Sequence, residues 1–243
     1  PGGTVTGDNV VSIPLGAVVT CTVTNTDNTP TLKLVKIVDN NDGGTAVADD
    51  YTLSATAPNP NDGRNFSSLG GSGSFHNVFA GAGYVLAESP NPGTGYTAGT
   101  WSCDGGNLVG STITITLGAA VTCTTHNTDN APQLKLVKVV TNDNGGTATA
   151  HDYTLSATTS AGGFTDRNFS NLGDANSFHD VYAGKNYVLA ESPNPGIGYT
   201  ASAWSCDGGT LVGNTISIPL GATVTCTITN NDNASSLTLN KIV

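Results

Sequence analysis

The chain has 243 residues, of which only 11% are charged and 37% are hydrophobic, and its formal net charge is −10. This acidity argues against nucleic acid or an anionic membrane surface as a partner. No apolar run is long enough to span a bilayer, and we find no signal peptide or sorting signal, so no membrane contact is expected within this stretch.

The sequence is a tandem array with a period of about 100 residues. LKLVKIV at 32–38 returns as LKLVKVV at 134–140, and YVLAESPNPG at 84–93 returns unchanged at 187–196. A period of this length is a whole small domain, much longer than a solenoid repeat. The expected pieces are the last strands of an upstream repeat at 1–29, two full repeats at 30–131 and 132–234, and the first strand of a further repeat at 235–243.

Each full repeat is a series of short strands separated by turn clusters, with no helical periodicity. Segments rich in Gly, Asn and Pro, such as SPNPGTG at 89–95, lie between the strands. This pattern predicts an all-β protein made of tandem immunoglobulin-like β-sandwich domains. In chain order, the strands expected in the first full repeat are 31–38, 50–56, 64–69, 74–79, 83–88, 96–103, 111–117 and 119–127.

The five cysteines form pairs once the repeat is taken into account. Cys103 and Cys123 belong to one full repeat, Cys206 and Cys226 belong to the next, and the members of each pair are 20 residues apart. Cys21 is equivalent to Cys123, so its partner is expected upstream and it is left unpaired in this stretch. We expect two disulfides, each contributing roughly 3 kcal/mol, and an oxidising, extracellular location. The histidines show no spacing typical of a metal site, and no cofactor is expected.

Period-two alternation places polar side chains on the core face of three strands. Lys36 shares a face with the leucines of the first strand, Glu88 with Leu86, and Asn127 with the apolar residues of the last strand. The equivalent residues of the second repeat are Lys138, Glu191 and Asn230. Burying an ion pair costs several kcal/mol per charge, so three such residues in one interior need a chemical explanation.

An intramolecular isopeptide bond would explain these residues. In an apolar setting a lysine amine can be neutral and nucleophilic, and a protonated glutamate can polarise the asparagine carboxamide and shuttle protons. Lys36 would then attack the carboxamide of Asn127 with help from Glu88, and ammonia would leave. This reaction happens once per domain and is autocatalytic maturation, so we do not expect an enzyme.

These features resemble bacterial surface-protein domains of the Cna B-type or SpaA-like class. The resemblance is carried by the inward lysine of the first strand, by YVLAESPNPGTGYT from residue 84, and by a last strand that ends in asparagine. It implies a prealbumin-like, inverse-immunoglobulin sandwich in both full repeats and a Lys–Asn isopeptide bond assisted by Glu88 or Glu191. The cysteine pair of WSC and VTC departs from the usual pilin pattern and indicates a branch that relies on the disulfide.

Two other interpretations of the polar set remain open. One is an unreacted Lys–Glu–Asn network in the core, and the other is a lysine that snorkels to the sheet edge as an ordinary ion pair. Asp50 and Asp152, which precede strand tyrosines, are weaker alternatives for the assisting acid.

Two further motifs recur without an obvious chemical role. DNNDGG at 39–44 and TNDNGG at 141–146 are acidic but lack the spaced ligands of an EF-hand, so we expect hairpin turns there rather than calcium sites. Arg64 and Arg167, the only arginines, recur in RNFS and are expected to make one structural contact per repeat.

The function we expect is structural: the repeat region of an extracellular, bacterial surface fibre, either a stalk or a filament. Its partners would be neighbouring repeats of the same chain and identical chains in a filament. Two alternatives are adhesin repeats that themselves bind a host glycan or protein, and a filament subunit that assembles by strand exchange between chains.

Overall fold

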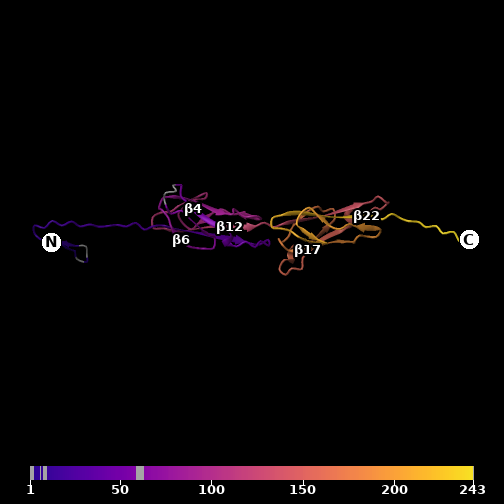
Figure 1. The fold of residues 1–243 in the computed structure, drawn as a ribbon, viewed down its shortest axis with the longest axis horizontal. Helices are drawn as coiled ribbons and strands as arrows, with labels where there is room; N and C mark the ends of the chain where they lie inside the picture. Colours follow the sequence, from indigo (N-terminus) through magenta and orange to yellow (C-terminus); the bar gives the residue numbers. More distant parts are fainter. Residues whose placement is uncertain (1–2, 6, 8–9, 59–62, 243) are drawn as a thin grey trace.

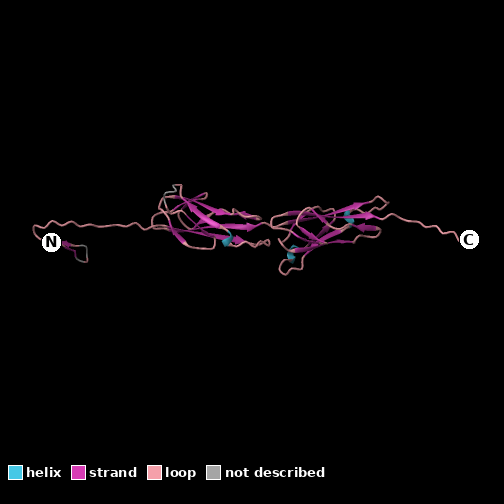
Figure 2. Cartoon of the chain, in the orientation of Figure 1, coloured by secondary structure: helices cyan, strands magenta, loops and turns pink. Residues whose placement is uncertain are grey.

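The computed structural model describes residues 3–5, 7, 10–58 and 63–242. Two β-sandwich domains lie end to end along the long axis of the molecule (Figure 1). Figure 2 shows that the described chain is almost entirely strand and loop, and its helical residues are single 3-10 turns at Ala48–Asp50, Ala150–Asp152 and Thr165–Arg167. No helix among the described residues is long and apolar enough to cross a membrane. The prediction of tandem all-β sandwich domains is confirmed.

The first domain has two facing sheets. One has the strand order β10-β11-β7-β4-β5, and the other has the order β6-β3-β12-β8, in which β9 also pairs with β12. The strands are β3 (Thr31–Asp39), β4 (Thr52–Thr56), β5 (Phe66–Leu69), β6 (Phe75–Asn77), β7 (Gly83–Ser89), β8 (Tyr96–Ala98), β9 (Ser102–Cys103), β10 (Asn107–Val109), β11 (Thr112–Thr114) and β12 (Ala120–Asp129).

The second domain repeats this topology strand for strand. Its sheets have the orders β15-β14-β17-β21-β20 and β16-β13-β22-β18, and β19 also pairs with β22. The strands are β13 (Gln133–Thr141), β14 (Thr154–Thr158), β15 (Phe169–Leu172), β16 (Phe178–Asp180), β17 (Asn186–Ser192), β18 (Tyr199–Ala201), β19 (Ser205–Cys206), β20 (Thr210–Val212), β21 (Thr215–Ser217) and β22 (Thr223–Asp232).

The first and last strands of each domain are direct neighbours and run parallel. In the first domain β3 pairs with β12 from Thr31 opposite Ala120 to Asp39 opposite Thr128. The pair β13–β22 repeats this arrangement in the second domain. A domain therefore begins and ends on the same two central strands, and the chain enters at one end of this pair and leaves at the other.

The core of each domain is built by alternation along these strands. Leu32 and Leu34 of β3 are buried and face Leu53, Tyr84 and their neighbours from the opposite sheet, as the period-two pattern predicts. The equivalent residues of the second domain form a matching cluster. The polar side chains described below lie at one end of this core.

Two details of the strand pattern differ from expectation. The segment expected as one strand at 96–103 is split into β8 and β9, because the chain leaves the edge of β12 between them while Trp101 packs against the core. The strand β10 was not expected at all. It pairs with β11 across the two-residue loop Gly110–Ser111, where Gly110 has a φ of 62°, a conformation that glycine adopts without strain.

The segments that flank the two domains contain little regular structure. Thr4–Val5 (β1) pairs with Val11–Ser12 (β2), whereas described residues 13–30 and 233–242 form no strand. The assignment of 1–29 and 235–243 to further repeats stays a prediction.

Candidate crosslinking site

The lysine of the first strand crosses the interior to the opposite sheet. Lys36 of β3 places its Nζ 2.5 Å from Oε2 of Glu88 on β7, and the two side chains are 0% and 3% exposed. In the second domain Lys138 Nζ lies 2.6 Å from Glu191 Oε2, and both side chains are fully buried. Each domain thus holds an ion pair that joins its two sheets and is shielded from water.

The asparagine of the last strand faces the same space. Asn127 lies two residues beyond Thr125, the residue opposite Lys36 in the parallel ladder, and is fully buried. Its Nδ2 donates to the carbonyl of Pro92 at 2.9 Å. In the second domain Asn230 Nδ2 donates both to Pro195 O at 2.8 Å and to Glu191 Oε2 at 3.3 Å. The site therefore brings together lysine, glutamate and asparagine from three strands.

The recurring SPNPG loop has a role that the sequence did not reveal. Its second proline carbonyl, from Pro92 or Pro195, holds the amide nitrogen of the asparagine. The asparagine carbonyl is left without a hydrogen-bond partner among the described residues, as is Oε1 of the nearby glutamate. These buried atoms are Asn127 Oδ1, Glu88 Oε1, Asn230 Oδ1 and Glu191 Oε1. Buried acceptors of this kind are costly and uncommon in stable domains.

Burial controls the electrostatics of the lysine. Desolvation lowers the pKa of Lys36 below its ordinary value of 10.5, and the hydrogen bond and charge of Glu88 only partly oppose this effect. The same causes lower the pKa of Lys138. The Nζ of Lys36 also lies 4.7 Å from the centroid of the Tyr51 ring. Burial therefore shifts the lysine toward the neutral amine, which is the nucleophilic form, whereas the carboxylate and the aromatic ring favour the ammonium.

A glycine allows the strand with the lysine to pack closely. Gly70 accepts the Lys36 amide hydrogen bond on its carbonyl at 3.1 Å, and a Cβ added to it would lie 2.5 Å from Lys36 Cβ. Gly173 is placed in the same way against Lys138. A larger residue here would push on the lysine directly.

The structure argues against two alternative interpretations of the buried lysine, glutamate and asparagine: a lysine at the surface, and Asp50 or Asp152 as the assisting acid. Lys36 does not snorkel to the surface, because its side chain is fully buried. Asp50 is not the assisting acid, because its carboxylate accepts the Val47 amide in an exposed 3-10 turn. Asp152 makes the equivalent contact with Thr149. The roles of Lys36, Glu88 and Asn127 in a crosslink, and of their equivalents Lys138, Glu191 and Asn230, stay predictions.

Comparison with known families identifies the domains. Residues 27–125 and 129–228 both match the SpaA-type family described as "Prealbumin-like fold domain". The chain belongs to this family. The resemblance expected from the inward lysine and the YVLAES motif is thereby confirmed.

Solved structures with a similar fold include those of a pilus adhesin and a major pilin. The C-terminal fragment of the pilus adhesin SpaC from Lactobacillus rhamnosus GG is 13% identical, with 85% of this chain and 99% of that chain covered and a TM-score of 0.42. The major pilin protein from Streptococcus pyogenes is 15% identical over 87% and 98% of the two chains, with a TM-score of 0.38. The Bacillus anthracis TIE protein is 13% identical over 84% and 34%, with a TM-score of 0.47. No curated protein matches the chain. We draw no functional conclusion from similarities at this level.

Both prealbumin-like domains carry the expected disulfide. Cys103 is bonded to Cys123 and Cys206 to Cys226, in each case between a two-residue strand and the last strand of the domain. Cys21 is free and exposed. Cys123 and Cys226 are fully buried in the core of their domains, and Cys103 and Cys206 pack against the same clusters.

An acidic residue after the asparagine has a structural role that was not expected. Asp129 is 2% exposed, and its carboxylate accepts the amides of Asn41, Asp42 and Gly44 at 2.7–2.8 Å. The DNNDGG segment therefore wraps its amide groups around a carboxylate, as anion-binding nests do. In the second domain Asp232 has this place. The alternation that placed Asn127 inward also places Asp129 inward, so the sequence did contain the signal.

Proposed function

We propose that the chain is a load-bearing repeat region of an extracellular, bacterial surface fibre, and that each domain seals itself with a Lys–Asn isopeptide bond. The observation that carries the proposal is the buried lysine, glutamate and asparagine set that links the first strand to the last strand in both domains. Membership of the prealbumin-like family is in keeping with such a role.

The strand arrangement supports a mechanical role. Tension applied to the ends of a domain enters at Thr31 of β3 and leaves at Asp129 of β12, and these neighbouring strands run parallel. Tension therefore shears the whole ladder at once instead of opening it one hydrogen bond at a time. A bond between Lys36 and Asn127 would carry the load from β3 to the last residues of β12, and the other strands would bear none of it.

The chemistry follows from the contacts. The Lys36 ammonium passes a proton to Glu88 along the 2.5 Å hydrogen bond that joins them, so the pair becomes neutral without a change in total charge. The free amine attacks Cγ of Asn127 while the carboxylic acid polarises Oδ1. Glu88 then relays a proton from the attacking nitrogen to the amide nitrogen, the C–N bond of the carboxamide breaks, and ammonia leaves. An amide between Nζ and Cγ remains, and Glu88 keeps its proton.

The orphaned acceptors support this sequence. A proton on the Glu88 carboxyl would supply a buried hydrogen-bond donor, and Oδ1 of Asn127 is a buried acceptor that has no donor among the described residues. The Pro92 carbonyl would orient the leaving amide nitrogen. Holding the reacting groups in place in this way supplies much of the acceleration in intramolecular reactions.

The intact mass of the denatured, reduced protein tests the proposal. We expect a deficit of one ammonia per full domain that survives reduction. Lys36→Ala should remove one deficit, because among the described residues Lys36 is the buried lysine of the first domain. The matched variant Lys33→Ala, on the outer face of the same strand, should leave both deficits in place. A reduced mass equal to the sequence value would leave the disulfides as the only crosslinks and would contradict the proposal.

A second candidate, direct binding of a glycan by the repeats, is favoured by one recurring surface feature. A shallow, uncharged recess of about 300 Å³ lies over β4 and β5, and one of about 370 Å³ lies over β14 and β15. The first is lined by Ser54, Thr56, Asn65, Phe66 and Ser67, and the second by Ser156, Thr158, Asn168, Phe169 and Ser170. Calorimetry with neutral oligosaccharides checks this: binding heat should be lost in a Ser54→Val, Ser156→Val variant, and no heat with any sugar in the panel rejects it.

A further inference from the structure

The two domains meet through specific contacts and not through a linker alone. The DNNDGG loop of the first domain reaches the second, where the Asp42 carboxylate pairs with the Arg167 guanidinium and the Asp42 carbonyl accepts the Ala183 amide at 2.8 Å. On the other side of the joint, the Asn130 carbonyl accepts the Gly221 amide at 2.9 Å. Contacts on two sides of the connection restrict both bending and rotation.

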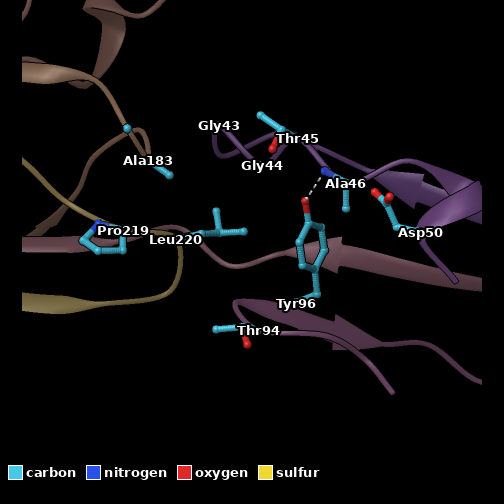
Figure 3. Close-up of a pocket in the computed structure, with 11 residues that line it drawn as sticks. Gly43, Gly44, Thr45, Ala46, Asp50, Thr94, Tyr96, Ala183, Pro219 and Leu220 are labelled. Carbon is cyan, nitrogen blue, oxygen red and sulfur yellow. Dashed lines mark hydrogen bonds between the residues drawn. The ribbon is translucent and has the colours of Figure 1, made fainter. Parts of the chain in front are cut away.

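The loop fits against the second domain because of a glycine. Gly43 has a φ of 95°, and a Cβ there would lie 2.7 Å from the Ala183 carbonyl oxygen. A cleft of about 530 Å³ lies beside this contact, and Figure 3 shows Gly43, Ala183 and Leu220 among the residues that line it. Without the clamp from Asp42 to Arg167, this open space would let the domains swing toward each other.

The arginine that receives the aspartate is fixed by its own domain. Arg167 lies over the Tyr182 ring, 4.1 Å from its centroid, and its Nη1 donates to the Val181 carbonyl at 3.2 Å. Its side chain and that of Asp42 are only 23% and 16% exposed. The guanidinium is therefore held in position to meet the neighbouring domain, and the charged pair is partly shielded from solvent.

The first domain presents the same socket at its own entry end. Arg64 lies 4.1 Å from the centroid of the Phe79 ring and donates to the Val78 carbonyl at 2.8 Å. No acidic side chain among the described residues pairs with it. The rest of the joint recurs as well, because Asn28 lies against Gly118 much as Asn130 lies against Gly221.

We propose that the arginine end of each domain is a docking socket for the DNNDGG-type loop of a preceding repeat, and that Arg64 is a free socket of this kind. The occupant is a further repeat of the same family that presents an aspartate at the position of Asp42. This inference does not depend on the isopeptide bond.

The residue at the Asp42 position would set the stiffness of each joint. In the second domain that position is Asn144, whose Nδ2 turns back to Asp143 Oδ1 at 2.6 Å and to the Asp232 carbonyl at 3.1 Å. A repeat that follows the second domain would therefore meet a neutral amide, and this joint would lack the ionic clamp. The joint after the first domain would then be locked, and the joint after the second domain would be compliant.

The chain offers a direct test because it contains only two arginines. Phenylglyoxal, which modifies accessible guanidinium groups, is added to the full folded chain, and the modification of each arginine is followed by peptide mass spectrometry. Arg167 should react about tenfold more slowly than Arg64, since the charge-assisted contact with Asp42 protects it. Asp42→Ala should raise the rate at Arg167 to that of Arg64 and leave Arg64 unchanged. Equal rates in the unmodified protein, or slow reaction at both residues, would overturn the proposal.

Two further measurements separate docking from local protection. Residual dipolar couplings should report one shared orientation for the two domains, which Asp42→Ala disrupts and Asn144→Ala does not. In a chain whose residues 1–29 are replaced by another copy of 30–131, Arg64 should become as slow to react as Arg167. If Arg64 stays fast in that chain, it is not a socket for a preceding repeat.

Discussion

The Asn127 side chain is held at its amide nitrogen, and its carbonyl oxygen has no hydrogen-bond partner among the described residues. The Pro92 carbonyl fixes its amide nitrogen, while its carbonyl oxygen is left in the space shared with Lys36 and Glu88. No single residue in this set is chemically unusual. Burial lowers the pKa of the lysine, the opposite sheet supplies the acid, and the loop orients the amide. The chemistry is therefore a property of where the strands place three ordinary residues.

The buried Asp232 carboxylate predicts that the stability of the second domain depends on pH in the acid range. Burial alone would raise the pKa of Asp232, but the amides of Gly146, Asn144 and Asp143 lower it from 3.8 to about 2. A lowered folded-state pKa adds stability above the unfolded value, and this stability is lost as the pH falls from about 4 toward 2. The protection factors of the amides in the 141–146 loop, measured against their intrinsic exchange rates, should therefore fall over that interval.

Asp232→Asn should weaken the protection of this loop at neutral pH and flatten its dependence on pH below 4. Asp180→Asn, a change at an exposed acid of the same domain, is the matched control and should keep the slope of the parent. If the Asp232 variant retains the full acid response, other carboxylates are responsible for it.

Much of this site follows from period-two alternation, and the remainder depends on loops. Alternation alone puts Lys36, Glu88 and Asn127 in the interior, where the structure has them. It would also have placed Asp129 there, but the surrounding TDN sequence is typical of a turn. The Pro92 carbonyl contact could not be predicted, because it depends on how a loop folds back over a strand far away in the sequence.

At the scale of strands, β12 makes the most pairings in the first domain, and β22 has the same place in the second. Strand β12 pairs with β3 along its whole length and with β8 and β9 on its other side, where the disulfide to Cys103 lies. Because β9 has only two residues, its hydrogen bonds alone hold it weakly. The sequence revealed this strand pairing only through the cysteines, and it gave no sign of the hairpin β10–β11 because a two-residue loop was concealed in a longer turn-rich segment.

Replacing both cysteines of the first domain by alanine should free this edge. We expect a loss of roughly 3 kcal/mol in unfolding free energy, the usual contribution of a disulfide that closes a loop of this size. Trp101 and Cys103 both pack against the core cluster, so loss of the disulfide should shift the Trp101 fluorescence toward that of exposed indole. Chemical unfolding followed by tryptophan fluorescence in a Trp204→Phe background, where Trp101 is the one tryptophan left, measures both effects. Cys21→Ser is the control and should change neither the unfolding free energy nor the fluorescence. An unaltered unfolding midpoint in the double cysteine variant would show that the disulfide does not stabilise the domain.

At the scale of the whole molecule, the parallel pairs and the joint lie along one axis. Load would pass through β3 and β12, cross the short connection at Asn130, and continue through β13 and β22 (Figure 1). The pairing of Asp42 with Arg167 joins residues 125 positions apart. Comparison of the two repeat sequences cannot find this contact, because Asp42 belongs to the first repeat and Arg167 to the second.

Single-molecule stretching distinguishes a sealed domain from an unsealed one. A sealed domain should show no full unfolding step, because Lys36 and Asn127 hold the intervening chain closed. Lys36→Ala should release about 80 residues in one step, a gain of roughly 270 Å at 3.3–3.6 Å per residue, because the Cys103–Cys123 disulfide keeps its own loop closed. Lys33→Ala should stretch like the parent protein. Full-length steps from both domains of the parent would mean that neither is sealed.

The pairing of first and last strands also sets the order in which such a chain can mature. The bond between β3 and β12 cannot form until every residue between them has emerged, so a chain exported as an unfolded thread would close its domains one by one from the amino-terminal side. A closed domain cannot be drawn back through a narrow pore as a single strand. Each domain that closes outside the pore would prevent the chain from sliding back, so export would become irreversible one repeat at a time.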